Sequence, residues 1–389
     1  LPDTSYYNSN SYADNLNNTH RLNLNLLYQI DTFNSIRVIP SFSFQQTNNR
    51  SNTDYRTLSK TQSPVNDGYS NSISNSEGYN FRNEIAWRRK FRRKGRTFSL
   101  SLQTTLNQTD GDGSLSSINS FYQSNGNLLR KDTFNQKSTI NGSLNGYTAR
   151  AVYTEPLGKR TLMEFSLGKS DTRNLSEKIT YDYNRNNGKY DLQNALLSND
   201  FENNFGFTNA GFRIRNQQKK YNFSMGINWQ QSDLDGKIIS GTKDSLISKR
   251  FQNLLPNARF QYNFTRFKNV SLTYNTNTNQ PNMSQLQPVP DVSNPLNIRE
   301  GNPDLKQEYN HNVQANLALI SPFSSKNLFL FLRAQAAQNK IVNYDSLNQQ
   351  TGVRKTKPVN VNGVYNLNAT FSYSRPVKFL KGNIEFSSN

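Results

Sequence analysis

Apolar and polar residues alternate along fourteen stretches of the chain, and this pattern predicts fourteen strands. The clearest stretch, Arg21–Ile30, reads RLNLNLLYQI. Because successive side chains of a strand point to opposite faces, this stretch has one apolar face and one polar face. The expected strands lie at 20–30, 36–46, 79–88, 97–107, 139–154, 161–169, 207–215, 220–230, 256–266, 269–277, 308–319, 327–338, 364–374 and 382–388.

The links between these strands alternate between short and long. This layout is typical of an outer-membrane barrel, which has tight periplasmic turns and long extracellular loops. The long links are rich in Asn, Ser, Asp and Gly, so we expect them to be mobile, water-exposed loops. Short links are expected at 31–35, 89–96, 155–160, 216–219, 267–268, 320–326 and 375–381, and long ones at 47–78, 108–138, 170–206, 231–255, 278–307 and 339–363.

The composition fits a β-sheet with one water-exposed face. Only 33% of the residues are hydrophobic, yet the chain has 24 Phe, 20 Tyr and 2 Trp, and aromatic residues are scarce in disordered chains. No apolar run approaches the length of a membrane helix. A soluble β-sandwich would also alternate, but it rarely has all its long links on one side. The prediction is an all-β, transmembrane antiparallel β-barrel.

The net charge is +19, and much of the excess lies in the short links. The run 88–96 alone contains Arg88, Arg89, Lys90, Arg92, Arg93, Lys94 and Arg96. Nucleic-acid surfaces need a contiguous basic stripe with stacking aromatic residues, whereas these charges are spread over successive turns, so nucleic acid is not an expected partner. A solvated rim is the simplest interpretation. Contact with anionic headgroups of the inner leaflet, or with an acidic partner or plug, is the alternative.

Residues with catalytic or metal-binding chemistry are sparse. The chain has no Cys, and its two histidines, His20 and His311, have no second His or carboxylate at ligand spacing. We therefore expect no enzyme activity, no catalytic or cofactor-binding residues, no cofactor and no metal site. The segments 110–113 (DGDG) and 233–236 (DLDG) lack the ligand spacing of an EF-hand. They are interpreted as plain turns, with ordered loop cations as the alternative.

The polar faces of the strands carry several arginines among Asn, Ser, Gln and Thr. In a wide barrel these side chains would line water or a plug, and a minority in contact with substrate would favour a polar or anionic cargo. The arginines are Arg21, Arg37, Arg213, Arg215 and Arg259.

The strongest local motif is GNPDLKQE, at 301–308. Gly permits positive φ, Pro fixes its own φ, and Asn or Asp caps the backbone locally, so the motif is turn chemistry that leads into a strand. An architectural role is the first interpretation, and direct contact with a ligand is the second. The motif residues are Gly301, Asn302, Pro303, Asp304, Leu305 and Lys306.

With the NPLNI at 294–298, the LQP near 286 and WRRKFRRKGRTFSLSL at 87–102, this motif resembles the TonB-dependent receptor-like barrels of Bacteroidota. The resemblance reaches across most of the chain and implies a 22-stranded barrel in a Gram-negative outer membrane, of which about 14 strands are visible. Residues 1–389 would then be part of one barrel domain. We expect its N-terminal plug and final strands to lie outside this segment, since no signal peptide is present and the chain stops inside an expected strand.

Such a barrel would import a scarce nutrient, powered by the TonB complex. The second hypothesis is a non-transporting scaffold or docking subunit of a larger outer-membrane complex, for surface-protein export or lipoprotein presentation. A passive porin is the third. The implied partners are outer-membrane lipid, the TonB complex and, for the second hypothesis, surface lipoproteins or other envelope proteins.

Two short signals lie in long links. Asp-Ser-Leu occurs at 244–246 and at 345–347, and it resembles the three-residue O-glycosylation acceptor of Bacteroidota. Ser245 and Ser346 are therefore candidate glycosylation sites.

Overall fold

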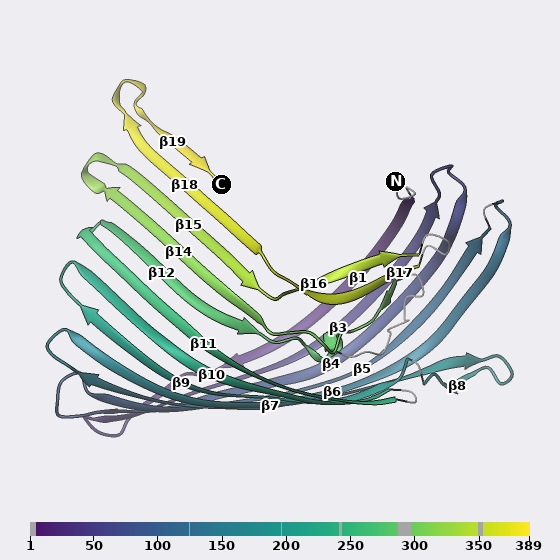
Figure 1. Ribbon diagram of the computed structural model, residues 1–389, viewed down its shortest axis with the longest axis horizontal. Helices are drawn as coiled ribbons and strands as arrows, with labels where there is room; N and C mark the ends of the chain where they lie inside the picture. Colours follow the sequence, from purple (N-terminus) through teal and green to yellow (C-terminus); the bar gives the residue numbers. More distant parts are fainter. Residues whose placement is uncertain (1–4, 124, 196, 241–242, 287–296, 349–352) are drawn as a thin grey trace.

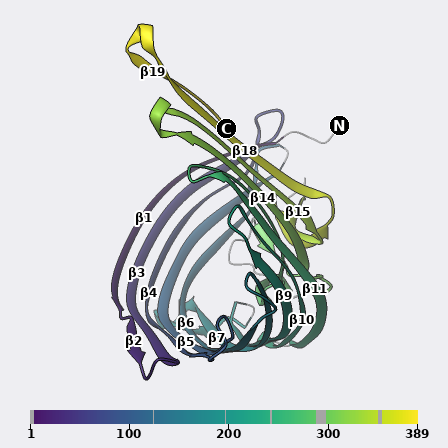
Figure 2. The same ribbon diagram turned by 90° about the vertical axis from the view of Figure 1, so that its left-hand side faces the viewer.

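A computed structural model describes residues 5–123, 125–195, 197–240, 243–286, 297–348 and 353–389. Fourteen strands follow one another in a single antiparallel sheet that curls into a deep open trough (Figures 1 and 2). The strands β1 and β19 lie at the two edges of this sheet. The architecture is the wall of an antiparallel β-barrel, which confirms the predicted fold class. Within the described part of the chain, no helix has the length and apolarity to cross a membrane.

The sheet follows chain order, so each strand pairs with its neighbours in sequence except where small elements intervene. Its fourteen strands are β1 (Tyr6–Asn23), β3 (Asn34–Leu58), β4 (Pro64–Lys90), β5 (Thr97–Tyr122), β6 (Leu128–Pro156), β7 (Thr161–Asn184), β9 (Asn199–Gln217), β10 (Tyr221–Ser240), β11 (Lys243–Thr265), β12 (Lys268–Asn279), β14 (Glu308–Ser321), β15 (Lys326–Gln338), β18 (Val364–Val377) and β19 (Gly382–Ser388). Two short strands, β2 (Leu26–Gln29) and β8 (Lys189–Gln193), pair with β3 and β7.

One proline explains why β1 and β2 are separate strands. Both pair with β3 in the same register, and they are interrupted at residues 24–25. Pro40 of β3 lies opposite this gap and has no N–H to donate to the ladder. Only the reverse bond remains there, from the Leu24 N–H to the Pro40 carbonyl at 3.0 Å. The strand expected at 20–30 is therefore real but divided.

The expectation of long mobile loops is wrong for most of the chain. The strands β3 to β7 have 24 to 29 residues each, because the polar links at 47–78, 108–138 and 170–206 continue the adjacent strands. Their alternation persists with polar residues on both faces, and cross-strand amides bond one another, as Asn48 Nδ2 does to Asn75 Oδ1 at 2.5 Å. Ladder pairing thus outweighs the low strand propensity of Asn and Gly.

The same correction applies to the two Asp-rich segments interpreted as turns. Residues 110–113 lie inside β5 and residues 233–236 lie inside β10, each in unbroken antiparallel register with both neighbours. The Asp233 carboxylate accepts a hydrogen bond from Arg250 Nε at 2.5 Å, and Asp235 accepts one from Ser248 Oγ at 2.7 Å. They are strand residues with protein partners.

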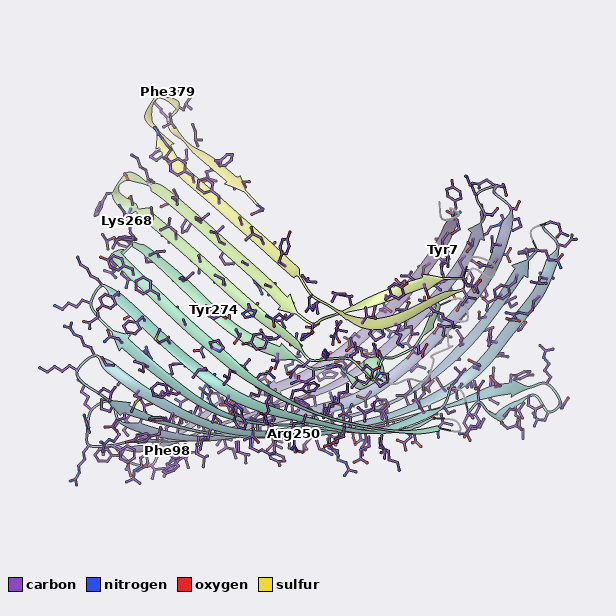
Figure 3. The ribbon with its side chains drawn as sticks, in the orientation of Figure 1. Tyr7, Phe98, Arg250, Lys268, Tyr274 and Phe379 are labelled. Atoms are coloured by element: carbon purple, nitrogen blue, oxygen red, sulfur yellow. The ribbon has the colours of Figure 1, made fainter. Side chains whose placement is uncertain are left out.

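The two faces of the wall differ in chemistry. Along β5, β10 and β18 the apolar alternate residues are strongly exposed: Leu100 is 45% exposed, Met225 57% and Leu367 68%. They form an apolar belt on the convex outer face, near the short turns. Figure 3 shows side chains on both faces of the sheet. Since short turns mark the periplasmic end of such barrels, the opposite end of the strands is the extracellular, or distal, end.

The main apolar core lies on the concave face, at the distal end. Its buried members are Leu234 and Ile247 from β10 and β11, together with Leu286 and Leu305 from the segment between β12 and β14. This segment contains the helix α1 (Met283–Leu286) and the strand β13 (Asn297–Arg299).

The last long link folds into a small second sheet. Between β15 and β18 the hairpin β16 (Lys340–Leu347) and β17 (Arg354–Val361) forms, and β13 joins β17 in parallel. The chain leaves the main sheet at Asn339, with φ 52°, and returns at Gly363, with φ 78°. Left-handed corners of this kind favour Gly and Asn. The Asn339 N–H donates to Asn362 Oδ1 at 2.8 Å, which fixes the two corners side by side.

Candidate functional site

The GNPDLKQE motif lies at the distal mouth of the trough and ends in the first residue of β14. Leu305 and Leu286 are fully buried, and both pack against Leu234 and Ile247 on the concave face. Ile341 of β16 packs against the same cluster. The motif therefore anchors the segment before β14, and the base of the hairpin, to the inside of the wall.

Asn302 organises the turn of the motif. Its N–H donates to the Gln285 carbonyl at 2.6 Å, and its side-chain Nδ2 donates to the Pro358 carbonyl of β17 at 3.0 Å. Its Oδ1 accepts the Asp304 N–H at 3.1 Å, which is the local capping expected of Asn in a turn. The backbone and side chain of this one residue thus join α1, the turn and the second sheet.

Asn360 of β17 clamps the next residue of the motif. Its Oδ1 accepts the Lys306 N–H at 2.7 Å, and its Nδ2 donates to the Lys306 carbonyl at 3.1 Å. The same Nδ2 donates to the Asn339 carbonyl at 2.7 Å. On the other side, Lys249 Nζ of β11 donates to the Leu305 carbonyl at 3.1 Å. The motif backbone is satisfied by partners far away in sequence.

Glu308, the last motif residue, is a buried charge with three partners. Its carboxylate pairs with Lys340 Nζ at 3.0 Å and accepts the Ile341 N–H at 2.8 Å and Asn279 Nδ2 at 3.0 Å. The side chain is 5% exposed and lies distal to the belt residues of β14, which begin at Val313. Burial raises the pKa of Glu308, but the Ile341 N–H, the Asn279 amide and the Lys340 ammonium outweigh it, so the pKa is lowered overall.

The architectural role of Gly301, Asn302, Pro303, Asp304, Leu305 and Lys306 stays a prediction, and the contacts of Asn302, Leu305 and Lys306 favour it. The turn-forming residues can be recognised in the sequence, but the residues that bind them cannot. Asn360, Lys249 and Lys340 lie in other strands, and only the strand register brings them to the motif.

Register also brings three arginines into one row on the concave face. Arg215 of β9 and Arg259 of β11 both pair with Ser224 of β10, and the same row continues through Thr273 and Gln314 to Arg333 of β15. Arg215 and Arg259 lie on strands about 10 Å apart, and the side chain between them, that of Ser224, is short.

The arginine row carries an uncompensated positive charge. Among the described residues, none of its three members forms an ion pair, whereas Arg213, one step more distal, pairs with Glu164 at 3.6 Å. The sequence pattern placed Arg215 and Arg259 on the polar face but missed Arg333, because only the register of six neighbouring strands aligns the three arginines. Arg21 lies in β1 and pairs with Ser43, and Arg37 donates to Asn25 Oδ1 at 3.0 Å.

One of the basic short turns is joined to its neighbour by ion pairs. In the turn after β4, Arg93 and Arg96 both bind Glu155, at 2.8 and 2.7 Å. Glu155 lies beyond Tyr153, the last belt residue of β6, and Tyr153 Oη also donates to it at 2.5 Å. The bonds from Arg96 and Tyr153 lower the pKa of Glu155 to about 2. Two successive turns are thereby joined.

The two candidate glycosylation residues lie in strands. Ser245 belongs to β11, and its side chain lies outside the described residues. Ser346 is exposed on β16, opposite Lys355 of β17, and lines a small hollow with Tyr344 and Lys357. The neighbouring Asp345 is held by Arg354 and by Thr356 Oγ1 at 2.6 Å.

Comparison with known proteins identifies a family with this architecture. A family model described as the outer membrane protein beta-barrel family matches residues 89–389. The chain belongs to that family. It is therefore an outer-membrane β-barrel protein of Gram-negative bacteria, and the predicted localisation is confirmed. No curated protein matches it in sequence.

Solved structures with a similar fold are outer-membrane receptors and transporters. The copper transporter OprC matches with a TM-score of 0.52 and 10% identity, over 96% of this chain and 59% of OprC. The Serratia marcescens hemophore receptor HasR, solved with HasA and heme, has a TM-score of 0.49 and 10% identity, over 88% and 52% of the two chains. A ferric enterobactin receptor (PfeA) mutant from Pseudomonas aeruginosa has 0.49 and 11%, over 96% and 60%. The chain thus spans a little over half the length of these structures.

Proposed function

We propose that the chain is part of a receptor-like barrel that takes up a nutrient, with energy supplied by the TonB complex. The proposal rests on the family, on the resemblance of the GNPDLKQE motif to receptors of Bacteroidota, and above all on the arginine row. A plug and further strands outside this sequence would complete the barrel domain. Catalysis, a cofactor and a metal are not part of the proposal.

The arginine row supports the proposal because of its position and its charge. It faces the inside of the wall, where Arg215, Arg259 and Arg333 stand without acidic partners among the described residues. A guanidinium group binds carboxylate or phosphate through two parallel hydrogen bonds. An anionic cargo, or an acidic surface of a plug, is the complement that such a row favours.

The test first measures bacterial growth on different nutrients. Deletion of the whole gene should produce a growth defect on particular nutrients, screened over a panel of metal, sugar and peptide sources, and loss of TonB should produce the same defect. The full-length triple variant R215Q/R259Q/R333Q should then restore growth poorly on those nutrients. The matched variant R266Q, in a short turn, should restore it fully. Ion conductance with no TonB-linked nutrient defect would instead indicate a passive porin.

The second candidate function is a non-transporting docking subunit, and the distal hairpin favours it. Tyr344 and Leu347 of β16 are 61% and 52% exposed, so the hairpin presents apolar side chains at the outer mouth, where a surface lipoprotein or exported protein could bind. Affinity purification from cells decides this point. A stable assembly that is lost in Y344S/L347S, with no TonB-linked nutrient defect, would favour docking over transport.

A further inference from the structure

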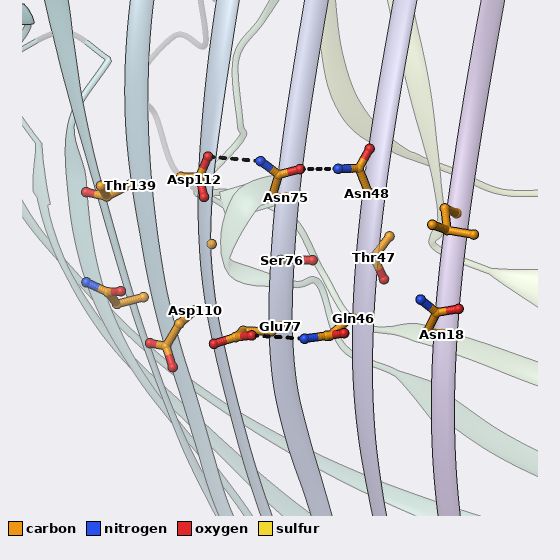
Figure 4. A pocket seen from close by; sticks show the side chains of 13 residues that line it. Asn18, Gln46, Thr47, Asn48, Asn75, Ser76, Glu77, Asp110, Asp112 and Thr139 are labelled. Atoms are coloured by element: carbon orange, nitrogen blue, oxygen red, sulfur yellow. Dashed lines mark hydrogen bonds between the residues drawn. The ribbon is translucent and has the colours of Figure 1, made fainter.

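The outer face of β1 and β3 to β6 contains a polar hollow of about 650 Å³. Its side chains form two cross-strand rows, visible in Figure 4. One row runs through Asn48, Asn75, Asp112 and Thr139, and the other through Asn18, Gln46, Glu77, Asp110 and Asn141. These two rows present a grid of amides, carboxylates and one hydroxyl on adjacent strands, and Thr47 and Ser76 also line the hollow.

Strand parity places the hollow on the outside of the wall. β5 keeps an unbroken register from Thr97 to Phe121, so its even-numbered residues share one face. Leu100 and Leu102 of the apolar belt are even-numbered, and so are Asp110 and Asp112. The hollow and the belt therefore lie on the same outer face of the sheet, at different positions along the strands.

The hollow begins directly above the aromatic border of the belt. Phe42 and Tyr79 stack at 6.4 Å between ring centroids and are 44% and 39% exposed. Aromatic residues at this position mark the membrane–water interface. Glu77 lies two residues beyond Tyr79, about 7 Å along the strand, and Asp110 lies four residues beyond Leu106, about 13 Å along it. This is the height of the headgroups of the outer leaflet.

The hydrogen bonds of the grid leave donors and acceptors available. Asn48 donates to Asn75 at 2.5 Å, Asn75 donates to Asp112 at 3.2 Å, and Gln46 donates to Glu77 at 3.4 Å. Each of these amides has a second N–H, and each carboxylate has a second oxygen. Sugar hydroxyls both donate and accept, so neighbouring hydroxyls of a sugar match an adjacent amide and carboxylate.

The same residues disfavour the other parts of a lipid. Glu77, Asp110 and Asp112 would repel a phosphate at close range. Leu16 is the one apolar side chain among the described residues that line the hollow, so an acyl chain would gain little there. We propose that this hollow binds the core sugars of the outer-leaflet glycolipid. The site is separate from the arginine row and does not depend on the transport proposal.

The test compares two double variants of the full-length protein in detergent. N48T/N75T removes amides from the hollow, and N80T/N107T removes a paired couple from the opposite face of β4 and β5. Thr has a high strand propensity, so both variants should keep the sheet. The probes are purified lipopolysaccharide with core sugars and lipid A without them, and native mass spectrometry measures their binding.

The unchanged protein and N80T/N107T should bind the core-bearing lipid at least tenfold more tightly than lipid A. N48T/N75T should lose that preference, and EDTA should leave it unchanged. Three results would overturn the proposal. They are equal binding of both lipids by the unchanged protein, an intact preference in N48T/N75T, and loss of the preference with EDTA, which would mean that carboxylates act through a bridging cation.

Discussion

Arg96 holds the carboxylate of Glu155 through two hydrogen bonds, from Nε to Oε2 at 2.7 Å and from Nη2 to Oε1 at 2.8 Å. Arg93 reaches the same carboxylate from the same turn and also donates to the Pro156 carbonyl at 2.8 Å. The bidentate geometry makes this pair more specific than an ordinary surface ion pair. It ties the turn after β4 to the turn after β6.

The first prediction concerns pH. The pKa of Glu155 is lowered from 4.5 to about 2 in the folded protein, so its contribution to stability is complete above about pH 4.5 and is lost as the pH falls toward 2. E155Q should remove this part of the acid sensitivity. Thermal unfolding of the full-length protein in detergent, measured between pH 2 and 6, checks it. E84Q, whose carboxylate has no ion pair within the described residues, is the control and should behave as the unchanged protein.

The second prediction concerns the anchor of the motif. L305A should release the segment before β14 from the concave face, because a buried Leu lost to Ala costs about 2–5 kcal/mol. Hydrogen exchange of residues 301–308 should become faster while exchange of β10 stays slow. L305M preserves volume and should show little change. Equal protection in L305A would mean that the hydrogen bonds of Asn302 and Asn360 suffice without the core contact.

The third prediction concerns Glu308 and Lys340. K340M should leave the carboxylate with the Ile341 N–H and the Asn279 amide, and the loss of a charged hydrogen bond should destabilise the base of the hairpin by about 1.5–3 kcal/mol. E308Q should cost a similar amount. In a double-mutant cycle the two losses should be clearly less than additive, because both remove the same pair. Full additivity, read from hydrogen exchange in β16 and β17, would contradict direct coupling.

The fourth prediction concerns orientation. The chain has no Cys, so single cysteines report position without background. S120C, near the distal end of β5, should react with a membrane-impermeant maleimide in intact cells. F91C, in the short turn after β4, should react only after the outer membrane is opened. Reaction of both in intact cells would overturn the orientation.

The sequence pattern predicted the strands well where one face is apolar. The short turns before β3 and after β4, β6 and β9 fall within a few residues of the expected ones, because alternation of Leu, Phe and Ile with polar residues stops at each turn. The distal halves of the strands were missed for the opposite reason. Both of their faces are polar, so only pairing with a neighbour, as between Asn48 and Asn75, reveals them as strands.

The candidate site, too, could be predicted from the sequence only in part. The turn chemistry of Asn302 and Pro303 is local and could be predicted. The burial of Leu305 and the clamp by Asn360 depend on a hairpin that begins more than thirty residues later, and the alignment of Arg333 with Arg259 depends on the registers of four strands. Local patterns carry no information on such long-range register.

The long polar halves of the strands have a mechanical consequence. From Leu106 to the end of β5 the wall continues for sixteen residues, which at the usual tilt of barrel strands raises its rim on the order of 40 Å above the apolar belt. The trough therefore opens well outside the membrane, on a stiff collar that is hydrogen-bonded along its length.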